Sequence, residues 1–570
     1  MKSNSFAKLK TPFCEFMGDI PWAVYPRPQM KRDSFFCLNG MWDFEAQKED
    51  KIPKIFGRKI LVPFAPESAL SGIDEVFEEG SYLFYKREFS LPRGFIKDRV
   101  LLHFGAVDQL CEVYLNGQKV GEHCGGYDAF CFDITSALCQ QNTLVVKAWD
   151  NLQDHILPYG KQRRNRGGMW YTPISGIWQT VWIESVPNEY ISDIKIVPSS
   201  DRVKISLYGV KSAVICIKTE NGEIKGTACP SAEIAIPQPK MWSPENPYLY
   251  EFTAAAGEDK ISSYFALRTL EIKKVEGKAR ILLNGKPYFF HGLLDQGYFS
   301  DGIYTPAAPE AFANDILEMK RLGFNTLRKH IKVEPEQFYY DCDRLGMIVF
   351  QDMVNNGHYS FFRDTALPTI NLKRLSDKNL HKNKKSREQF VLGMKKTVKQ
   401  LYNHPSICYW TMFNEGWGQF CSDEMYSLFK TLDNTRIIDT ASGWFKGGES
   451  DVESEHIYFK PFKFKPAQKP TVLSEFGGYS YRPEGHIFNL KKAYGYRFFE
   501  NRDEFEAALI SLYENEIIPA AKSGLSGAIY TQVSDVEDET NGLLSYDRRV
   551  CKVGGEKMRA IAKQLNDAIE

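Results

Sequence analysis

Short apolar runs separated by turn residues fill the first 186 residues of the chain. Runs such as LLHFGAVD, AFCFDIT and NTLVVKAWDN have the pattern of antiparallel strands that bury one face. Asn116-Gly117 predicts a type I′ hairpin turn, and Gly125-Gly126 predicts positive φ angles where the chain turns sharply. Residues 187–272 carry a second, smaller set of such runs. The pattern therefore predicts two β-sandwiches in succession.

After Arg280 strand-like runs alternate with amphipathic segments of helical length, the pattern of a parallel sheet made of βα units. Eight strand-like runs follow one another: YFFHG, NTLRKH, MIVFQDM, ICYWTMFNE, RIIDTAS, HIYF, TVLSEFGG and GAIYTQVSD. Eight units close a barrel of about 250 residues or more. The predicted fold is a jelly-roll-like β-sandwich over residues 1–186, an immunoglobulin-like β-sandwich over 187–272 and a C-terminal (β/α)8 TIM barrel over 273–570.

The composition and charge are those of a globular protein that does not bind polyanions. Hydrophobic residues make up 43% of the chain, and Lys plus Arg equal Asp plus Glu at 72 each. Such a balance favours neither nucleic acid nor an anionic membrane as a partner. The N-terminal MKSNSFAKLKTPFCEF lacks the apolar core of a signal peptide, so we expect a soluble, cytoplasmic protein with its 12 cysteines reduced. Homo-oligomerisation stays open.

Two glutamates end predicted barrel strands. Glu415 follows Asn414 at the end of the fourth run, and Glu475 ends the seventh, before FGG. Active sites of such barrels lie at the carboxyl ends of the strands, which together form the mouth of the barrel. Two carboxylates about 5–5.5 Å apart there are what double-displacement glycoside hydrolysis requires. The alternative is that each glutamate merely ends a strand and pairs with an arginine.

Several long motifs occur in one order along nearly the whole chain. They are LNGQKVGEHCGGYDAFCFDIT and SGIWQTVWIE in the first predicted domain, WSPENPYLY before the barrel, and GFNTLRKHIK, HPSICYWTMFNEGWG and LSEFGG within it. With these motifs the chain resembles the family 2 glycoside hydrolases, which include β-galactosidases, β-glucuronidases and β-mannosidases. The resemblance implies a glycoside hydrolase with Glu415 as general acid/base, Asn414 on the sugar 2-hydroxyl and Glu475 as nucleophile.

Other positions follow from the same resemblance. It places Arg328 beside the nucleophile, where a positive charge keeps a carboxylate ionised, and Tyr458 where a hydroxyl steadies that carboxylate. His330 belongs to a stretch in which this chain departs from the common family form, because Lys329 and Ile331-Lys332 surround it. Further polar or aromatic residues end predicted strands and are candidates to line a sugar subsite: His291, Asp295, Asp352, Trp444, Gln532 and Asp535.

No cofactor and no metal are expected, because no local cluster matches the magnesium and sodium sites of the longest relatives. The sequence predicts a retaining exo-β-glycosidase that removes a terminal sugar from an oligosaccharide or glycoconjugate. A carbohydrate-binding protein without turnover is the alternative of another class.

The identity of the sugar is unsettled. β-Glucuronidases carry an Asn-x-Lys pair after the last barrel strand, whereas here Asn541 is followed by Leu543. This difference favours a β-galactosidase-like specificity. The alternative is a β-hexuronidase that binds a glucuronide or galacturonide carboxylate through Lys329, Lys332, Arg548 or the basic stretch from Lys373 to Arg387. The role of that stretch is otherwise open.

Overall fold

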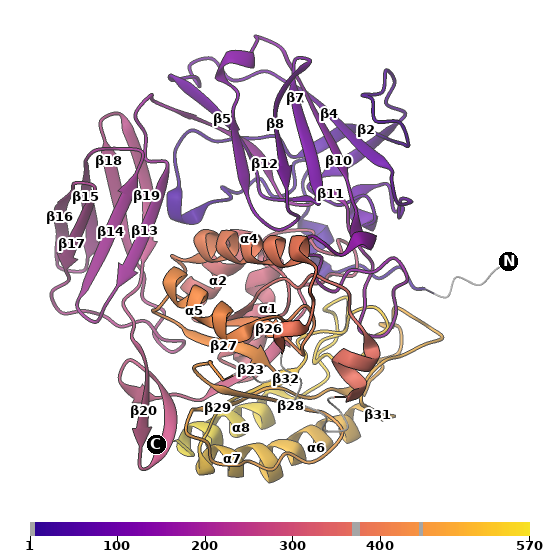
Figure 1. The fold of residues 1–570 in the computed structure, drawn as a ribbon, viewed down its shortest axis with the longest axis vertical. Coiled ribbons are helices and arrows are strands. Elements are labelled where there is room, and N and C mark those ends of the chain that lie inside the picture. The colour runs from indigo at the N-terminus through magenta and orange to yellow at the C-terminus, as the bar shows by residue number, and fades with distance from the viewer. Residues whose placement is uncertain (1–5, 368–376, 444–447, 570) are drawn as a thin grey trace.

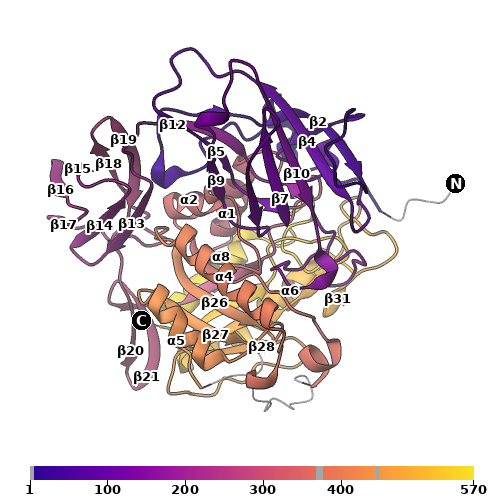
Figure 2. The same cartoon turned by 45° about the horizontal axis from the view of Figure 1, so that its top comes forward.

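The computed structural model describes residues 6–367, 377–443 and 448–569. Figure 1 shows three parts: a large assembly of strands from the N-terminal third at the top, a smaller set of strands at one side, and mixed helices and strands below. Figure 2 shows helix α4 (Lys384–Leu401) on the side of the barrel that faces the N-terminal strands. The sequence prediction of two β-sandwiches followed by a barrel is confirmed.

The N-terminal sandwich consists of a four-stranded sheet of order β1-β12-β5-β9 packed on a six-stranded sheet of order β3-β2-β4-β10-β7-β8. In β7 every second side chain, including Val113 and Leu115, is buried in the core between the sheets. A short β6-β11 pair completes the domain. The strands are β1 Phe36–Cys37, β2 Gly40–Gln47, β3 Arg58–Val62, β4 Tyr82–Phe89, β5 Arg99–Phe104, β6 Val107–Asp108, β7 Leu110–Leu115, β8 Gln118–Cys124, β9 Phe130–Asp133, β10 Asn142–Trp149, β11 Gly176–Ile177 and β12 Val181–Val186.

The two predicted glycine turns have different causes. Asn116 and Gly117 have φ angles of 53° and 83° between β7 and β8, so the predicted type I′ turn is confirmed. Gly125 has a φ of 128°, also as predicted, but Gly126 is not among the residues with positive φ. A Cβ on Gly126 would lie 1.9 Å from Oδ1 of Asp108. The prediction for Gly126 was therefore wrong in its reason, because close approach of a carboxylate and not backbone conformation excludes a side chain.

The second sandwich packs a three-stranded sheet of order β13-β14-β17 on a four-stranded sheet of order β16-β15-β18-β19. Its strands also alternate, with Val203, Ile205 and Leu207 of β14 buried. A three-stranded sheet, β20-β21-β22, then runs across the domain boundary predicted at residue 272. The strands are β13 Asp193–Pro198, β14 Arg202–Tyr208, β15 Ala213–Thr219, β16 Gly222–Ala228, β17 Ser231–Ala235, β18 Tyr250–Ala256, β19 Asp259–Phe265, β20 Leu270–Val275, β21 Lys278–Leu283 and β22 Lys286–Pro287.

Eight parallel strands form the barrel, in the order β27-β26-β25-β24-β23-β32-β29-β28. Seven of the eight, including the strand that ends in Asn414, are buried along their whole length, because helices cover one face and packed side chains fill the other. Each of the eight predicted runs overlaps one of these strands, although HIYF shares only its first two residues with β28. They are β23 Phe290–Asp295, β24 Thr326–Lys329, β25 Ile348–Asp352, β26 Ile407–Asn414, β27 Ile437–Ser442, β28 Glu453–Ile457, β29 Thr471–Gly477 and β32 Leu525–Thr531.

The ends of the barrel helices carry residues that commonly begin, cap or end helices. Helix α2 is preceded by Pro335 and ends at Gly346, whose φ is 74°. The side chain of Asn383 caps α4 and that of Asn501 caps α6. The remaining helices and the short β30-β31 pair are α1 Glu310–Arg321, α2 Glu336–Leu345, α5 Ser422–Leu432, α6 Arg502–Leu512, α7 Ile518–Ser523, α8 Gly555–Asp567, β30 Tyr479–Tyr481 and β31 Arg497–Phe499.

Strands β27 and β28 are the two ends of the sheet, and they meet without a backbone ladder in the described residues. We call this junction the seam. Side-chain hydroxyls bridge it: Oγ of Ser442 lies 3.2 Å from Oγ of Ser454 and 3.0 Å from Oγ of Ser474. His456 of β28 also lies 2.9 Å from Oγ of Ser442, and the N–H of Asp451, just before β28, donates to the carbonyl of Ile438 at 3.0 Å. In the described residues the seam is thus held mainly by side-chain contacts.

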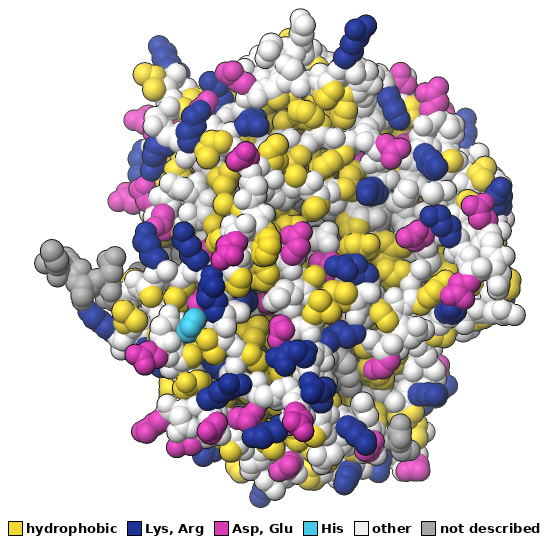
Figure 3. Space-filling view, turned by 180° about the vertical axis from the view of Figure 1, so that it is seen from behind, with side chains coloured by type: hydrophobic (Ala, Val, Ile, Leu, Met, Phe, Trp, Pro, Cys, Tyr) yellow, Lys and Arg dark blue, Asp and Glu magenta, His cyan; other side chains and the backbone are white. Residues whose placement is uncertain are grey.

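Two further expectations concern the chain as a whole. All 12 cysteines are unpaired, with Cys408 buried but Cys216 only partly so. Within the described ranges, none of the helices combines the length and apolar character needed to cross a bilayer. On the face shown in Figure 3, basic and acidic side chains are interspersed.

Candidate active site

Glu415 stands in a tight turn directly after β26. Glu415 and Gly416 have φ angles of 52° and 74°, and the N–H of Trp417 donates to the carbonyl of Asn414 at 3.0 Å. A left-handed conformation is uncommon for glutamate and costs of the order of 1–3 kcal/mol, so neighbouring contacts must hold it. The N–H of Glu415 donates to the carbonyl of Ser442 at 2.9 Å. The turn presents the carboxylate at the mouth of the barrel, where 21% of the side chain is exposed.

Glu475 lies near the end of β29 with only 6% of its side chain exposed. Its Oε1 accepts a hydrogen bond from Nη1 of Arg328 at 3.0 Å, and its Oε2 accepts one from the Tyr458 hydroxyl at 2.5 Å. Burial by itself would raise the pKa of this carboxyl, but His456, Arg328 and the Tyr458 hydroxyl outweigh burial and lower the pKa to about 2. Glu475 is therefore an anion at neutral pH.

The ring of His456, in β28, connects the two glutamates. Its Nδ1 lies 2.8 Å from Oε1 of Glu415 and 3.5 Å from Oε2 of Glu475. Its Nε2 lies 2.9 Å from Oγ of Ser442. A carboxylate oxygen of Glu415 and one of Glu475 come within 4.8 Å of each other. The three side chains form one hydrogen-bonded cluster across the seam.

The same three residues are the one group with the spacing of metal ligands in the described part of the chain. Neighbouring ligands of a tetrahedral zinc are about 3.3 Å apart, given metal–ligand bonds of about 2.0–2.1 Å. The 2.8 Å between Glu415 and His456 is shorter and is that of a direct hydrogen bond. The geometry thus fits a proton-sharing pair better than a metal site.

Arg328 joins the predicted residues into one network. Its side chain is fully buried, and it donates from Nε to Oδ1 of Asp352 at 3.0 Å and from Nη2 to Oδ1 of Asn414 at 2.8 Å, in addition to its bond to Glu475. Burial would lower the pKa of Arg328, but the carboxylates of Asp352 and Glu475 raise it. The guanidinium is therefore a permanent cation that fixes the relative positions of the nucleophile candidate and Asn414.

His330 and Asp352 are behind this network. Nδ1 of His330 lies 2.8 Å from Oδ2 of Asp352. Burial lowers the pKa of His330 to about 4, whereas Arg328 and His330 lower the pKa of Asp352 against the effect of its own burial. Both side chains are at most 2% exposed. Asp352 holds Arg328 and His330 in place.

Tyr458 lies in the wall of the site. Besides Glu475 its hydroxyl contacts Oγ1 of Thr531 at 2.9 Å. Its ring is stacked on that of Tyr496, with centroids 3.9 Å apart and an interplanar angle of 8°. Tyr458 is thus held both by a hydroxyl pair and by a ring face.

Three more predicted subsite residues end barrel strands but are already engaged. Asp295 accepts from Nζ of Lys329 at 2.6 Å. Gln532 donates to Oδ1 of Asn541 at 2.8 Å, and Asp535 accepts from Nζ of Lys552 at 2.6 Å. All three are buried, and Oε1 of Gln532 makes no hydrogen bond to another described residue.

The structure does not bring His291 into the site. It is the second residue of β23, its Nδ1 lies 3.1 Å from the carbonyl of Gly323, and its ring packs on Phe324 and Tyr513. These contacts lie outside the strands, so the expectation that His291 lines a subsite does not hold. His404, below β26, is a buried partner of Asp343 at 2.7 Å. Trp444 lies outside the described residues.

The basic residues that could bind a uronate also have partners. Lys329 pairs with both Asp295 and Glu334, and Lys332 pairs with Glu334 at 2.9 Å. Arg548 pairs with Asp315 at 3.2 Å. In the described part of the basic stretch, Arg387 donates to the carbonyls of His381 and Leu380. Carboxylates thus neutralise Lys329, Lys332 and Arg548, although Nη2 of Arg548 makes no hydrogen bond to another described residue.

Sequence reasoning missed His456 and an aromatic wall. Trp170, Tyr359 and Trp417 contact one another edge to face, with the Trp170 and Trp417 centroids 5.1 Å apart. His456 could have been found, because it lies in β28 two positions before Tyr458, which directly follows the strand, and side chains two positions apart in an extended chain point to the same face. Trp170 comes from a loop of the N-terminal sandwich, for which the strand pattern carries no signal.

That loop reaches the barrel. Arg166 pairs with Glu537 at 2.9 Å, the hydroxyl of Tyr171 donates to Glu539, and Asn541 donates to the same carboxylate at 3.0 Å. The N-terminal sandwich therefore forms one side of the mouth.

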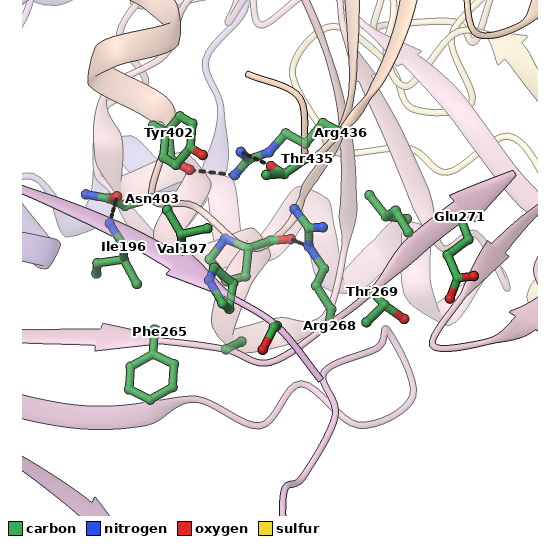
Figure 4. Close-up of a pocket in the computed structure, with 15 residues that line it drawn as sticks. Ile196, Val197, Phe265, Arg268, Thr269, Glu271, Tyr402, Asn403, Thr435 and Arg436 are labelled. Carbon is green, nitrogen blue, oxygen red and sulfur yellow. Dashed lines mark hydrogen bonds between the residues drawn. The ribbon is translucent and has the colours of Figure 1, made fainter. Parts of the chain in front are cut away.

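A separate pocket of about 290 Å³ lies between the second sandwich and the barrel (Figure 4). Arg268 donates there to the carbonyls of Pro405 and Ile407, and Arg436 donates to that of Tyr402. Ile407 begins β26 and Arg436 directly precedes β27, so the pocket lies at the amino-terminal end of the barrel strands, opposite the two glutamates. The guanidinium groups of Arg268 and Arg436 are thus used to bind backbone carbonyls of the barrel.

Comparisons with known families agree with this architecture. A model described as "Glycosyl hydrolases family 2, TIM barrel domain" matches residues 273–552. Two further models, "Glycosyl hydrolases family 2, sugar binding domain" and "Glycosyl hydrolases family 2", match residues 71–187 and 190–268.

Relatives with curated names are distant. A beta-galactosidase of Thermoanaerobacter pseudethanolicus is 25% identical over 73% of this chain and 57% of its own length, and the human beta-glucuronidase is 24% identical over 73% of this chain and 69% of its own. A solved GH2 beta-galacturonidase from Eisenbergiella tayi bound to galacturonate superposes with a TM-score of 0.68 at 20% identity, over 95% of this chain and 99% of that one. Among the first curated relatives that match, the chain spans between 35% and 57% of their length.

Proposed function

The chain belongs to glycosyl hydrolase family 2, and from this premise we propose that it is a retaining exo-β-glycosidase that works by double displacement. The observation that carries the proposal is the pair of glutamates: Glu475 is held as an anion within 4.8 Å of Glu415. Inverting enzymes keep the two carboxyl groups about 6.5–9.5 Å apart to admit a water molecule, and retaining enzymes about 5–5.5 Å. The separation here supports direct attack by one carboxylate.

In the first step Glu475 attacks the anomeric carbon while protonated Glu415 donates its proton to the leaving glycosidic oxygen. The carbon–oxygen bond to the aglycone breaks, and an ester between the sugar and Glu475 forms. In the second step ionised Glu415 takes a proton from water, which displaces Glu475 and releases the sugar with its β configuration. Two inversions therefore give net retention.

Neighbouring residues have tasks that follow from their contacts. Oδ1 of Asn414 is occupied by Arg328, whereas its amide nitrogen makes no hydrogen bond to another described residue and can donate to the sugar 2-hydroxyl. Arg328 and Tyr458 stabilise the carboxylate of Glu475 and release it as the ester forms. His456 positions Glu415 and shares its proton.

An exo mode of action is supported by the contact between the N-terminal loop and the barrel rim. The Arg166–Glu537 pair and the Tyr171–Glu539 bond close the mouth on one side, so a chain end fits more readily than the middle of a polysaccharide. The substrate would then be an oligosaccharide or glycoconjugate with a terminal β-linked sugar. Leu543 stands where β-glucuronidases carry lysine, and this difference taken by itself favours a neutral sugar such as galactose.

The test is the anomer that appears first. Hydrolysis of an aryl β-glycoside in an NMR tube should show the β-sugar before mutarotation, and E475Q should abolish turnover. Initial release of the α-anomer would refute double displacement. Binding of sugars with no hydrolysis of any β-glycoside would favour the non-catalytic alternative.

A further inference from the structure

Two basic side chains of the N-terminal loop reach the aromatic wall without an acidic partner. Nζ of Lys161 lies 6.0 Å from the ring centroid of Trp170. The guanidinium carbon of Arg163 lies 3.6 Å above the same ring and 5.4 Å from that of Tyr359. Within the described ranges neither side chain has a carboxylate oxygen within 4.0 Å, whereas Arg164 and Arg166 on the same loop do.

This lack of partners sets the two residues apart from the other cations around the mouth. Arg328, Lys329, Lys332, Arg548 and Lys552 all have carboxylate partners between 2.6 and 3.2 Å. Both residues are partly buried, and a partly buried cation without a carboxylate partner is able to pair with an anionic ligand. Burial indeed lowers the pKa of Arg163, with only tyrosines acting in the opposite direction.

The charge of Lys161 affects ionisable residues of the barrel at the mouth of the site. Burial is the main cause of the lowered pKa of His330, and the Lys161 ammonium lowers it further. Burial raises the pKa of Glu539, and Lys161 opposes that rise. Both oxygens of Glu539 are already bonded, to Tyr171 and Asn541.

The backbone next to Lys161 also contacts the barrel: the N–H of Gly160 donates to the carbonyl of Asn355 at 3.3 Å, and a Cβ on Gly160 would lie 2.8 Å from the carbonyl oxygen of Ile331. Lys161 therefore lies beside the strand end that carries His330, and its ammonium makes no hydrogen bond to another described residue.

We propose that Lys161 binds the C6 carboxylate of the terminal sugar, and that this sugar is a β-linked hexuronic acid. The inference rests on the proposed function and adds the substrate class. A lysine ammonium suits this task because it is a compact charge with three donors that a single carboxylate can accept. The C6 hydroxymethyl group of a neutral sugar would leave the charge unpaired. Arg163, stacked on Trp170, adds to the positive potential at the same wall.

Matched substrates that differ only at C6 test the proposal. The kcat/KM values of aryl β-glucuronide and β-glucoside, and of aryl β-galacturonide and β-galactoside, should differ within at least one pair by about 10- to 150-fold in favour of the uronide, the factor of a hydrogen bond to a charged group. In K161M that ratio should collapse toward one through loss of uronide hydrolysis. K204M, which removes an exposed lysine of β14, is the control and should keep the wild-type ratio.

Several outcomes would overturn the inference while leaving the proposed function intact. A wild-type preference for both neutral sugars would do so, as would equal loss of uronide and neutral hydrolysis in K161M. Faster hydrolysis of a 6-phosphoglycoside than of the uronides would overturn the carboxylate assignment. If no glycoside were hydrolysed, calorimetry with free galacturonate and glucuronate against galactose and glucose still decides: uronate binding lost in K161M supports the inference, and its absence in wild type refutes it.

Discussion

The hydroxyl of Tyr458 offers the sharpest test of how this site keeps its nucleophile ionised. Tyr458→Phe removes one donor to Oε2 of Glu475, at 2.5 Å, and leaves the ring stacked on Tyr496. A hydrogen bond to a charged group contributes about 1.5–3 kcal/mol, and one pKa unit corresponds to about 1.4 kcal/mol. The pKa of Glu475, about 2 in the intact site, should therefore rise by roughly one to two units.

The sign of the effect follows from which form the bond stabilises. The hydroxyl stabilises the carboxylate, so its removal favours the protonated acid, which cannot attack the anomeric carbon. The acid limb of the kcat/KM profile, which reports the free enzyme, should move to higher pH by the same one to two units. The kcat/KM at neutral pH should also fall by about 10- to 150-fold, to the extent that the bond is also made in the transition state.

The assay is a pH profile of aryl β-glycoside hydrolysis, with Tyr496→Phe as the matched control. That variant loses a hydroxyl one ring away that has no bond to Glu475, and it keeps the stacked pair. An unshifted acid limb in Tyr458→Phe, or an equal shift in both variants, would refute the reasoning.

Three further predictions concern other parts of the network. Glu475→Gln should lower turnover by several orders of magnitude in steady-state assays, because no other group can form the glycosyl ester, and near-native activity would contradict the mechanism. Glu415→Ala should slow alkyl glycosides far more than dinitrophenyl glycosides and should regain turnover with azide as a β-glycosyl azide detectable by NMR, whereas Glu475→Ala should give the α-azide; the absence of rescue in both would remove the role assignment. Lys329→Met should lower the free energy of unfolding by about 3–5 kcal/mol in denaturant titrations, because Asp295 and Glu334 lose a buried partner, and a loss no larger than that of Lys204→Met would contradict this.

The sequence predicted the architecture because its periodicities are local. Alternation in β14 and unbroken apolar runs in β26 report how many faces of a strand are buried, and that is a property of the neighbouring sheet layers. The strand-end rule then placed Glu415 and Glu475 at one mouth, and the structure brings them together with Asn414, Arg328 and Tyr458.

What depends on pairing between distant segments could not be predicted. Lys329 ends β24, but Asp295, 34 residues earlier in the chain, pairs with it. Arg548 pairs with Asp315, 233 residues away, and no local pattern in the sequence reveals such partners. Lys161 has no carboxylate partner among the described residues, and the sequence could not show this either, because its surroundings form only when the N-terminal sandwich packs on the barrel. His291 shows the remaining weakness, because a residue at the start of a strand faces the helices instead of the mouth.

The seam bears on how this protein fails when heated. The shorter path around the barrel from Glu415 to Glu475 runs through β27 and β28, and so crosses the junction at which the described residues show side-chain hydroxyl contacts and no backbone ladder. Local opening begins where few backbone hydrogen bonds must break. The gap between the catalytic carboxylates should therefore widen while the rest of the fold is intact, and the protein would lose activity at a temperature at which its circular dichroism is still native. Its working limit would then be set by a few hydroxyl contacts beside the catalytic pair, and replacing those contacts would raise that limit without a change in global stability.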